Sequence, residues 1–351
     1  MRRIAFVVPG SLDMATGGSR YDRMMVQGLR ERGWQVDTSE LDGAFPFPTR
    51  LDSDRAARAI AAIPDGTVTV IDGLVHGALP EIVEREAVRL PIVALVHLPI
   101  AADLTLDPAR SRQAETGERR ALAAARRIVV TGSATVSLLE RYALTGREVV
   151  VIEPGTARRP LAAGSDGDDL QLLCVATLQP GKGHHILLEA LGSVSSRNWH
   201  LTCAGSVLRD TATAERVRAL VQTFGLDRHV SFDGELDEPS LAARYDVRDV
   251  FVLATLQETY GMAVAEALAH GLPVVSTACG AIPELVGQTA GLIVPPGDVA
   301  ALRAGLESVI SDGALRARLR DGARHRRELL PSPEHAVDRF SVLLEELQVH
   351  G

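Results

Sequence analysis

Short runs of aliphatic and β-branched residues alternate with helical patterns along the whole sequence, and this alternation restricts the fold more than any other feature. Such an alternation is typical of parallel sheets with crossover helices. The first half predicts strands at Ile4–Val8, Gln35–Leu41, Val68–Ile71, Ile92–Val96, Arg127–Val130 and Val149–Ile152. The second half predicts strands at Leu170–Ala176, His200–Ala204, Val230–Phe232, Val250–Leu253, Pro273–Ser276 and Leu292–Val294. The sequence therefore predicts an α/β protein with two doubly wound, Rossmann-like sheets.

The length and one polar stretch indicate where two domains divide. A chain of 351 residues exceeds what one core usually holds. Pro154–Pro160 and the polar Gly164–Asp169 have the composition of an interdomain linker. We predict domains at 1–160 and 161–331. A helix over 332–351 has an amphipathic pattern that could pack on either domain, and could therefore return to the first. Because ligands bind outside the carboxyl ends of parallel strands, we expect the two domains to face a central cleft.

Composition excludes several classes of protein. A net charge of −8 argues against general binding to nucleic acid or anionic lipid. The apolar run after Met1 stops at Pro9, which favours a first strand over a signal peptide, and no run approaches the length of a membrane span. An odd number of cysteines, Cys174, Cys203 and Cys279, fits a reducing compartment. The sequence predicts a cytoplasmic protein that is not integral to a membrane.

Two glutamates flank the start of a predicted helix after the strand Val250–Leu253. Glu258 lies in the loop and Glu266 lies one to two turns into the helix. A carboxylate accepts hydrogen bonds through two oxygens and therefore suits neighbouring sugar hydroxyls. The free N–H groups of the first helical turn favour an anion. A pair of solvated helix glutamates is the plain alternative, because the spacing alone does not exclude it.

Lys182 is the only lysine in the chain, since every other fixed cation is arginine. It lies in a turn between Gly181 and Gly183, after the strand Leu170–Ala176 and before a helix. A mobile ammonium at this place suits a diphosphate. The alternative is that one lysine survived there by chance.

Together these residues resemble glycosyltransferase family 4, a retaining family with the two-Rossmann-domain GT-B fold. The resemblance rests on Glu258-x7-Glu266, the Lys182-Gly183 turn, and the segment from Gly271 to Glu284. In the first half it rests on Gly17-Gly18 in the first strand-to-helix loop, on His97, and on matching segments at 118–133 and 153–155. It covers nearly the whole chain.

The resemblance implies a role for each matching residue. Glu266 would hold the donor ribose, Glu258 would contact the transferred sugar, and Lys182 would neutralise the diphosphate. His97 would contact the donor sugar or the acceptor near the reacting carbon, although an ordinary strand-end histidine is the alternative for His97 alone. The implied catalytic residues are His97, Lys182 and Glu258. The implied donor-binding residues are Gly17, Gly18, Thr177, Lys182, Glu258, Thr259, Tyr260, Gly261, Met262, Ala263 and Glu266.

Thr177 departs from the family pattern, which usually has an arginine five residues before the lysine. One of two expected phosphate cations is therefore missing. Arg20, His184 and Arg209 are candidates to replace it. The departure keeps open a weakly binding or inactive relative.

We predict metal-independent transfer from a UDP- or GDP-sugar to a hydroxyl acceptor, with the departing phosphate acting as base on the same face. No cofactor and no catalytic metal are expected, because Asp52-Ser-Asp54 and Asp166-Gly-Asp168 do not end predicted strands. A dinucleotide oxidoreductase would need Gly-x-Gly-x-x-Gly after a strand, and no such string occurs. A GT-B epimerase, a phosphorylase and a silent binding subunit remain as alternatives.

The expected partners are a nucleotide-sugar donor and a small-molecule, glycan or lipid acceptor, with no nucleic acid. The acceptor pocket would lie in loops such as Gly43–Leu51 and Ile100–Arg112. Arg110–Arg127 contains six arginines against two glutamates. A solvated helix face is favoured there over a peripheral membrane contact, because the segment contains no aromatic anchor.

Overall fold

The computed structural model describes residues 2–14 and 16–349. The chain forms two compact units, the first from Met1–Gly155 with Pro331–Gly351 and the second from Thr156–Leu330. The divisions lie close to the sequence-based boundaries at residues 160 and 331. Met1, Ala15, His350 and Gly351 belong to the predicted first domain and C-terminal helix but lie outside the described residues.

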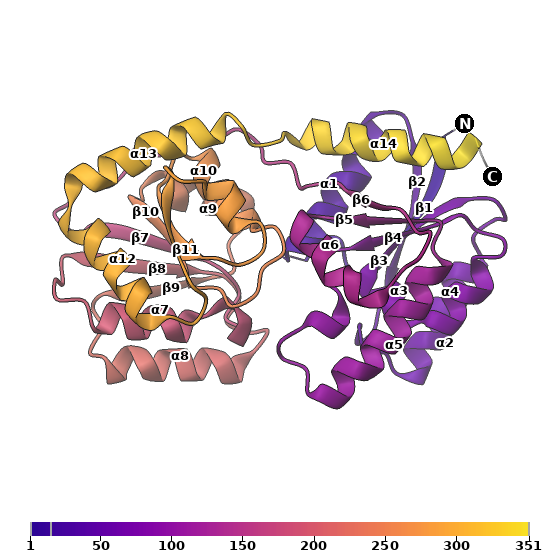
Figure 1. The fold of residues 1–351 in the computed structure, drawn as a ribbon, viewed down its shortest axis with the longest axis horizontal. Helices are drawn as coiled ribbons and strands as arrows, with labels where there is room; N and C mark the ends of the chain where they lie inside the picture. Colours follow the sequence, from indigo (N-terminus) through magenta and orange to yellow (C-terminus); the bar gives the residue numbers. More distant parts are fainter. Residues whose placement is uncertain (1, 15, 350–351) are drawn as a thin grey trace. The chain divides into compact units, whose positions relative to one another are not determined.

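The first unit is built on a sheet of six parallel strands in the order β2-β1-β3-β4-β5-β6 (Figure 1). The strands are β1 Arg3–Pro9, β2 Gln35–Leu41, β3 Val68–Asp72, β4 Ile92–Val96, β5 Arg127–Val130 and β6 Val149–Val151. Every residue of β3 and β4 is buried. Strands with helices on both faces must be apolar throughout, which explains their continuous hydrophobic runs.

Successive residues of these strands point to opposite faces and fill two cores. Ile4, Phe6 and Val8 pack with α1 (Gly17–Glu31) and α14 (Pro333–Val349). Ala5 and Val7 pack on the other face, with α2 (Arg50–Ala61), α3 (Gly73–Ala78) and α4 (Pro80–Glu86). A third cluster joins β4, β5 and β6 with α5 (Pro108–Ala124), α6 (Ser133–Leu139) and the 3₁₀ turn η2 (Glu140–Tyr142).

The second unit repeats this plan with the strand order β12-β11-β10-β7-β8-β9. Its strands are β7 Leu170–Val175, β8 Trp199–Ala204, β9 Val230–Gly234, β10 Val250–Leu253, β11 Val274–Thr277 and β12 Gly291–Val294. Its helices are α7 His184–Gly192, α8 Thr211–Thr223, α9 Glu238–Asp246, α10 Met262–Ala269, α11 Ile282–Val286, α12 Val299–Ser311 and α13 Gly313–Arg327. Both predicted six-stranded parallel sheets are confirmed, with strand ends within two residues.

Many of the helices begin after a residue whose side chain accepts a hydrogen bond from the first turn. Thr16, Thr49 and Asp72 cap α1, α2 and α3. Aspartates at 107, 210, 237, 298 and 312 cap α5, α8, α9, α12 and α13. Such caps satisfy backbone N–H groups that have no partner within the helix.

The helix α14 packs on the first unit, beside α1 and the first strands (Figure 1). Phe340 and Leu344 are fully buried there. The indole of Trp34 donates to Ser341 Oγ at 2.9 Å, and Gln348 donates to the carbonyl of Arg3 at 2.9 Å. The chain therefore returns to its first unit after completing the second.

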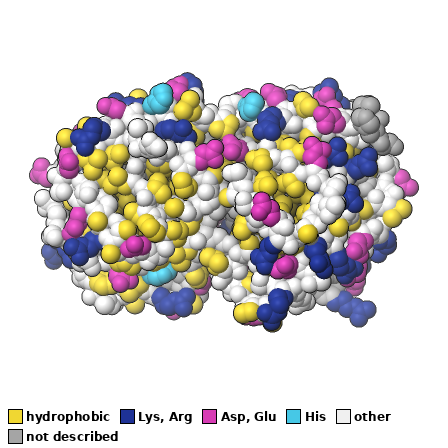
Figure 2. Space-filling view, viewed as in Figure 1, with side chains coloured by type: hydrophobic (Ala, Val, Ile, Leu, Met, Phe, Trp, Pro, Cys, Tyr) yellow, Lys and Arg dark blue, Asp and Glu magenta, His cyan; other side chains and the backbone are white. Residues whose placement is uncertain are grey.

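Several arginines on the surface are paired with acids. In Figure 2, basic and acidic side chains are interspersed on the viewed face. Arg120 on α5 pairs with Glu81 and Glu84 of α4 at 2.7 and 2.6 Å. Arg110 lies over the ring of Phe47, which is exposed. Phe47 lies outside the basic segment 110–127, which contains no aromatic residue of its own. Among the described residues, no helix combines the length and hydropathy that a membrane span requires.

Candidate functional site

Lys182 and Glu258 meet at the carboxyl ends of two neighbouring strands of the second sheet. Lys182 ends the 3₁₀ turn η3 (Pro180–Lys182) after β7, and Glu258 follows β10. The ammonium donates to Glu258 Oε2 at 2.8 Å, and the two side chains are 29% and 18% exposed. The structure thus brings together two residues that lie 76 positions apart in the sequence. Both remain partly open to solvent and can reach a ligand.

The turn that carries Lys182 is fastened to the loop after β10. Gly181 O accepts from Leu256 N at 2.8 Å and from Thr255 Oγ1 at 3.0 Å. Gly183 has φ +67°, and a Cβ there would lie 1.9 Å from Ala254 O. Only glycine fits so close a contact in this backbone conformation. Lys182 is therefore held by backbone contacts on both sides.

Glu258 lies in a loop that a second glycine turn supports. Gly280 has φ +54°, and a Cβ there would lie 2.3 Å from Glu258 O. Ala281 N donates to Thr259 O at 3.0 Å. The helix α10 then begins after Gly261, which has φ +97° and offers no side-chain cap. The first N–H groups of α10, near Met262 and Ala263, are thus available to an anion.

Glu266 lies in α10 and is half-buried. The hydroxyl of Tyr245 donates to Glu266 Oε2 at 3.2 Å. The Tyr245 ring stacks on His270 at a centroid distance of 4.9 Å, which fixes the phenol. The hydrogen bond from Tyr245 thereby orients the carboxylate of Glu266. Glu258, Thr259, Tyr260, Gly261, Met262, Ala263 and Glu266 therefore lie within one segment that follows the carboxyl end of β10.

Thr177 follows β7 in a tightly packed stretch. A Cβ on Gly205 would lie 2.8 Å from Thr177 N, and Leu178 N donates to Ser206 O at 3.0 Å. Of the candidates to replace the missing arginine, His184 is only 2% exposed, and its Nε2 lies 3.8 Å from Cys174 Sγ. His184 faces the core and is a poor phosphate ligand. Arg209 is 29% exposed, with Nε 4.0 Å from Glu235.

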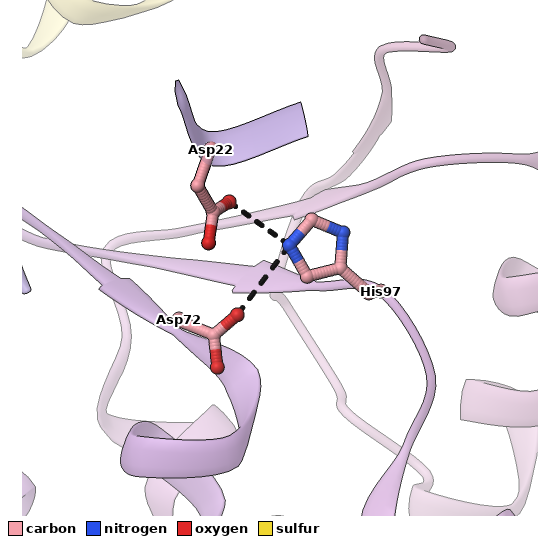
Figure 3. A group of neighbouring side chains, drawn as sticks. All are labelled: Asp22, Asp72 and His97. Carbon is pink, nitrogen blue, oxygen red and sulfur yellow. Dashed lines mark hydrogen bonds and ion pairs between the residues drawn. The ribbon is translucent and has the colours of Figure 1, made fainter. Parts of the chain in front are cut away.

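In the first unit, His97 follows β4 and contacts two buried aspartates (Figure 3). Its Nε2 lies 2.9 Å from Asp22 Oδ1 and 3.4 Å from Asp72 Oδ2. Burial alone would lower the pKa of His97, but the two carboxylates raise it above its ordinary value. Burial raises the pKa of Asp22, and the imidazole opposes that rise. These groups form a charged cluster at the carboxyl end of the first sheet.

The prediction that Gly17 and Gly18 lie in a loop is wrong. They are the first two residues of α1, which begins after the cap Thr16. A Cβ on Gly18 would lie 3.1 Å from His97 Cδ2. Gly18 therefore lets the imidazole lie against the start of the helix, whether or not a diphosphate also approaches there.

Asp22, Asp72 and His97 offer ligand-type atoms within 4.8 Å of one another, a spacing at which they could hold a cation. The contacts of His97 Nε2 with both aspartates account for that spacing without a cation. The expectation that the reaction needs no metal stays a prediction.

Sequence reasoning missed the supporting residues. Asp72 directly follows the predicted strand Val68–Ile71, so its place at a strand end was a usable signal. Asp22 lies one turn beyond Gly18, on the face of α1 that meets His97. Thr255 and Tyr245 gave no signal, because their roles depend on contacts made only in the folded domain.

The two sheets and the loops at their carboxyl ends define a class, the GT-B fold, and comparison with known proteins agrees. Sucrose-phosphate synthase from Thermosynechococcus elongatus superimposes with a TM-score of 0.86 at 21% identity, over the whole of both chains. Anabaena HepE in complex with UDP-glucose gives 0.78 at 15% identity, over 98% of this chain and 100% of that one. At these identities the likeness shows the fold.

Residues 160–326 match the sequence model of the family described as glycosyl transferases group 1. The second unit is therefore a domain of that family, and the predicted resemblance to glycosyltransferases is confirmed at this level. Assignment to family 4 stays a prediction.

Curated relatives extend the similarity beyond this domain. Glycogen synthase of Mycobacterium tuberculosis is 31% identical over 290 residues, 79% of this chain and 66% of that one. D-inositol 3-phosphate glycosyltransferase of Corynebacterium efficiens is 31% identical over 160 residues, 44% of this chain and 38% of that one. This alignment and three others cover only 36–50% of the length of the relatives concerned.

Proposed function

We propose that this protein is a retaining glycosyltransferase that moves a sugar from a nucleoside-diphosphate sugar to a hydroxyl acceptor. The observation that carries the proposal is the Lys182–Glu258 pair, held at 2.8 Å beside the start of α10. An ammonium next to free helix N–H groups suits a diphosphate, and Glu266 four residues into the same helix suits a ribose diol.

In the proposed reaction the bond between the anomeric carbon and the diphosphate oxygen breaks, and negative charge develops on that oxygen. Lys182 and the N–H groups at the start of α10 stabilise this charge. The acceptor oxygen attacks on the same face, and its proton passes to the departing phosphate. No protein nucleophile and no metal take part in this scheme. Glu258 exchanges its contact with Lys182 for hydroxyls of the transferred sugar.

The donor is proposed to carry UDP or GDP. One structural neighbour, HepE, was solved in complex with UDP-glucose. The acceptor is proposed to be a sugar, polyol or lipid-linked hydroxyl compound. The names of relatives favour this chemistry, since they include a D-inositol 3-phosphate glycosyltransferase and a mannosyltransferase.

The first test is binding of nucleoside diphosphates to the purified chain. A ligand that binds only the folded state raises its stability, so a thermal-shift screen with UDP, GDP, ADP and TDP should identify one base. Calorimetry then gives its affinity. Turnover of the matching nucleotide sugar is measured with an acceptor panel, with EDTA and without it.

Glu266→Gln is expected to weaken binding of the identified diphosphate about 5- to 150-fold, because a charged acceptor for the ribose hydroxyls is lost at ~1–3 kcal/mol. The matched control is Glu215→Gln, a change at an exposed glutamate of α8. Equal affinities of the two variants would remove Glu266 from the donor site. Binding without any turnover would instead favour a silent relative, the reading that Thr177 suggests. Epimerised donor in the absence of acceptor would favour an epimerase.

A further inference from the structure

The ring of His97 is contacted on three sides by the first unit. Its Nε2 faces Asp22 Oδ1 at 2.9 Å and Asp72 Oδ2 at 3.4 Å. Its Cδ2 edge lies against Gly18. Tyr21 meets it edge-on, with ring centroids 5.4 Å apart and an interplanar angle of 76°. Figure 3 shows the remaining nitrogen, Nδ1, pointing away from both aspartates.

The two aspartates come from separate elements, and their side chains are almost completely shielded from solvent. Asp22 lies on α1 and its side chain is 2% exposed, while Asp72 ends β3 and its side chain is 4% exposed. The side chain of His97 is 19% exposed, so its ring still reaches solvent. Asp72 Oδ1 is engaged by Leu74 N at 2.8 Å, which leaves Oδ2 for the imidazole.

The other titratable group facing the ring, Tyr21, sends its hydroxyl elsewhere. It donates to Ile152 O at 3.0 Å. The charged groups that contact the imidazole, among the ion pairs of the described residues, are the two carboxylates. A lone pair on Nε2 would point at both of them, so Nε2 must carry a proton. Two buried carboxylates also favour a second proton on the ring, because an imidazolium compensates their charge.

We infer that Asp22 and Asp72 are positioning residues that hold His97 Nε2–H toward the protein and present Nδ1–H to the substrate. This inference deepens the proposed function, and the catalytic role that it gives to His97 rests on that function. His97 then acts as a hydrogen-bond donor to an oxygen of the sugar donor or acceptor. It does not act as the base that takes the acceptor proton, which is consistent with proton transfer to the departing phosphate.

The test that does not depend on turnover is a ¹⁵N-histidine NMR titration of the full chain from pH 6 to 10. The His97 signals are assigned by their loss in His97→Gln. Both ring nitrogens of His97 are expected to be protonated at pH 7.5, where an ordinary histidine, with a pKa of ~6.5, is mostly neutral. Asp22→Asn and Asp72→Asn are each expected to lower the midpoint by at least about one pH unit. Asp54→Asn, at an exposed aspartate of the same unit, is the control.

Asp72→Asn is the second variant should Asp22→Asn fail to fold, because asparagine still caps α3. A His97 midpoint near pH 6.5 that neither change moves would overturn the inference. A His97 signal that is changed by one equivalent of Mn²⁺ or Zn²⁺ and restored by EDTA would assign the trio to a metal and overturn it as well.

Kinetics separates this inference from the proposed function. With the identified donor, both asparagine variants are expected to lower kcat at least tenfold at pH 8.5 while donor KM changes less than threefold. The basic limb of the pH profile should move to lower pH in step with the NMR midpoint. Unchanged kcat in both variants would overturn the catalytic meaning. No turnover in any variant, with the NMR result as expected, would reject the proposed function but leave the hydrogen-bond arrangement of His97 standing.

Discussion

At the scale of single residues, Lys182 is unusual both in the composition of the chain and in its position. It is the only lysine of the chain, and its ammonium is placed 2.8 Å from Glu258 by a glycine turn. An ammonium is compact and donates in three directions, whereas a guanidinium is planar and wider. Conservative replacement by arginine therefore does not preserve the contact.

Lys182→Ala is expected to lower kcat/KM by about 30- to 1000-fold, because a preorganised donor to developing charge contributes ~2–4 kcal/mol. Lys182→Arg should also lower it, by at least tenfold, although the charge is retained. The measurement is kcat/KM for the identified donor and acceptor. Arg218→Ala, at an exposed cation of α8, serves as the control.

The Lys182–Glu258 contact makes the two residues interdependent. The loss in Lys182→Ala/Glu258→Gln is expected to fall short of the sum of the single losses by at least 0.5 kcal/mol, as found for residues in contact. Strict additivity would mean that the ion pair has no part in catalysis. Near-normal kcat/KM in Lys182→Ala would remove the lysine from the site altogether.

Residues that belong to a local motif could be predicted, whereas residues that act through space could not. Glu258 and Glu266 lie in one segment, and Lys182 lies in a turn at a predicted strand end. Asp22 meets His97 across 75 positions, and nothing in the spacing of either residue indicates that contact. The arrangement depends on strand order, which places the ends of β1, β3 and β4 side by side.

At the scale of elements, the strands were predictable because buried parallel strands are continuous apolar runs. The start of α1 was not, because Gly17-Gly18 has the composition of a loop. A glycine pair is tolerated in the first helical turn here because Thr16 caps it and because His97 occupies the space of a side chain. Tertiary packing thus overrides the local preference of glycine.

Replacing two glycines inside helices by alanine is expected to change stability in opposite directions. Gly28 lies in α1, where a Cβ would lie 2.5 Å from Val337 Cγ2 of α14. Gly305 lies in α12, where a Cβ would meet Val275 Cγ1 at an ordinary 3.7 Å. Gly28→Ala should destabilise the first unit by about 1–2 kcal/mol through overpacking. Gly305→Ala should stabilise the second unit by ~0.5–1 kcal/mol, since alanine is the better helix former.

Denaturant-dependent hydrogen exchange, read separately for peptides of the two units, gives both free energies. A single melting temperature would not serve, because a two-domain chain need not unfold in one step. Changes of the same sign in both variants would contradict the packing described for α1 and α14.

At the scale of the whole molecule, the destination of α14 was left open by its amphipathic pattern. Either sheet could have accepted an apolar helix face. The helix packs on the first unit because of two features of that unit. Gly28 on α1 leaves space for Val337, and the indole of Trp34 donates a hydrogen bond to Ser341. Both features become informative only after the fold is known.

Phe340→Ala is expected to lower the unfolding free energy of the first unit by about 3–5 kcal/mol, as for truncation of a fully buried phenylalanine. The second unit should be unchanged. Val342→Ala on the same helix is the control, because Val342 is 56% exposed and should shift stability by less than ~0.5 kcal/mol. Hydrogen exchange in β1 and β3 is the readout. A loss confined to α14 itself would mean that the helix frays without supporting the sheet.

The return of α14 to the first unit also sets an order of events during synthesis. Domains generally fold as units in the order in which they leave the ribosome. Here the strands β1 and β2 emerge early, but the helix that covers one face of their sheet is made only after Thr156–Leu330. About 180 residues separate the last strand of the first sheet, which ends at Val151, from α14, which begins at Pro333. At ~5–20 residues per second that delay is about 9 to 36 seconds. For that interval Ile4, Phe6 and Val8 lack part of their cover, and the nascent chain offers chaperones an apolar face that the finished protein hides.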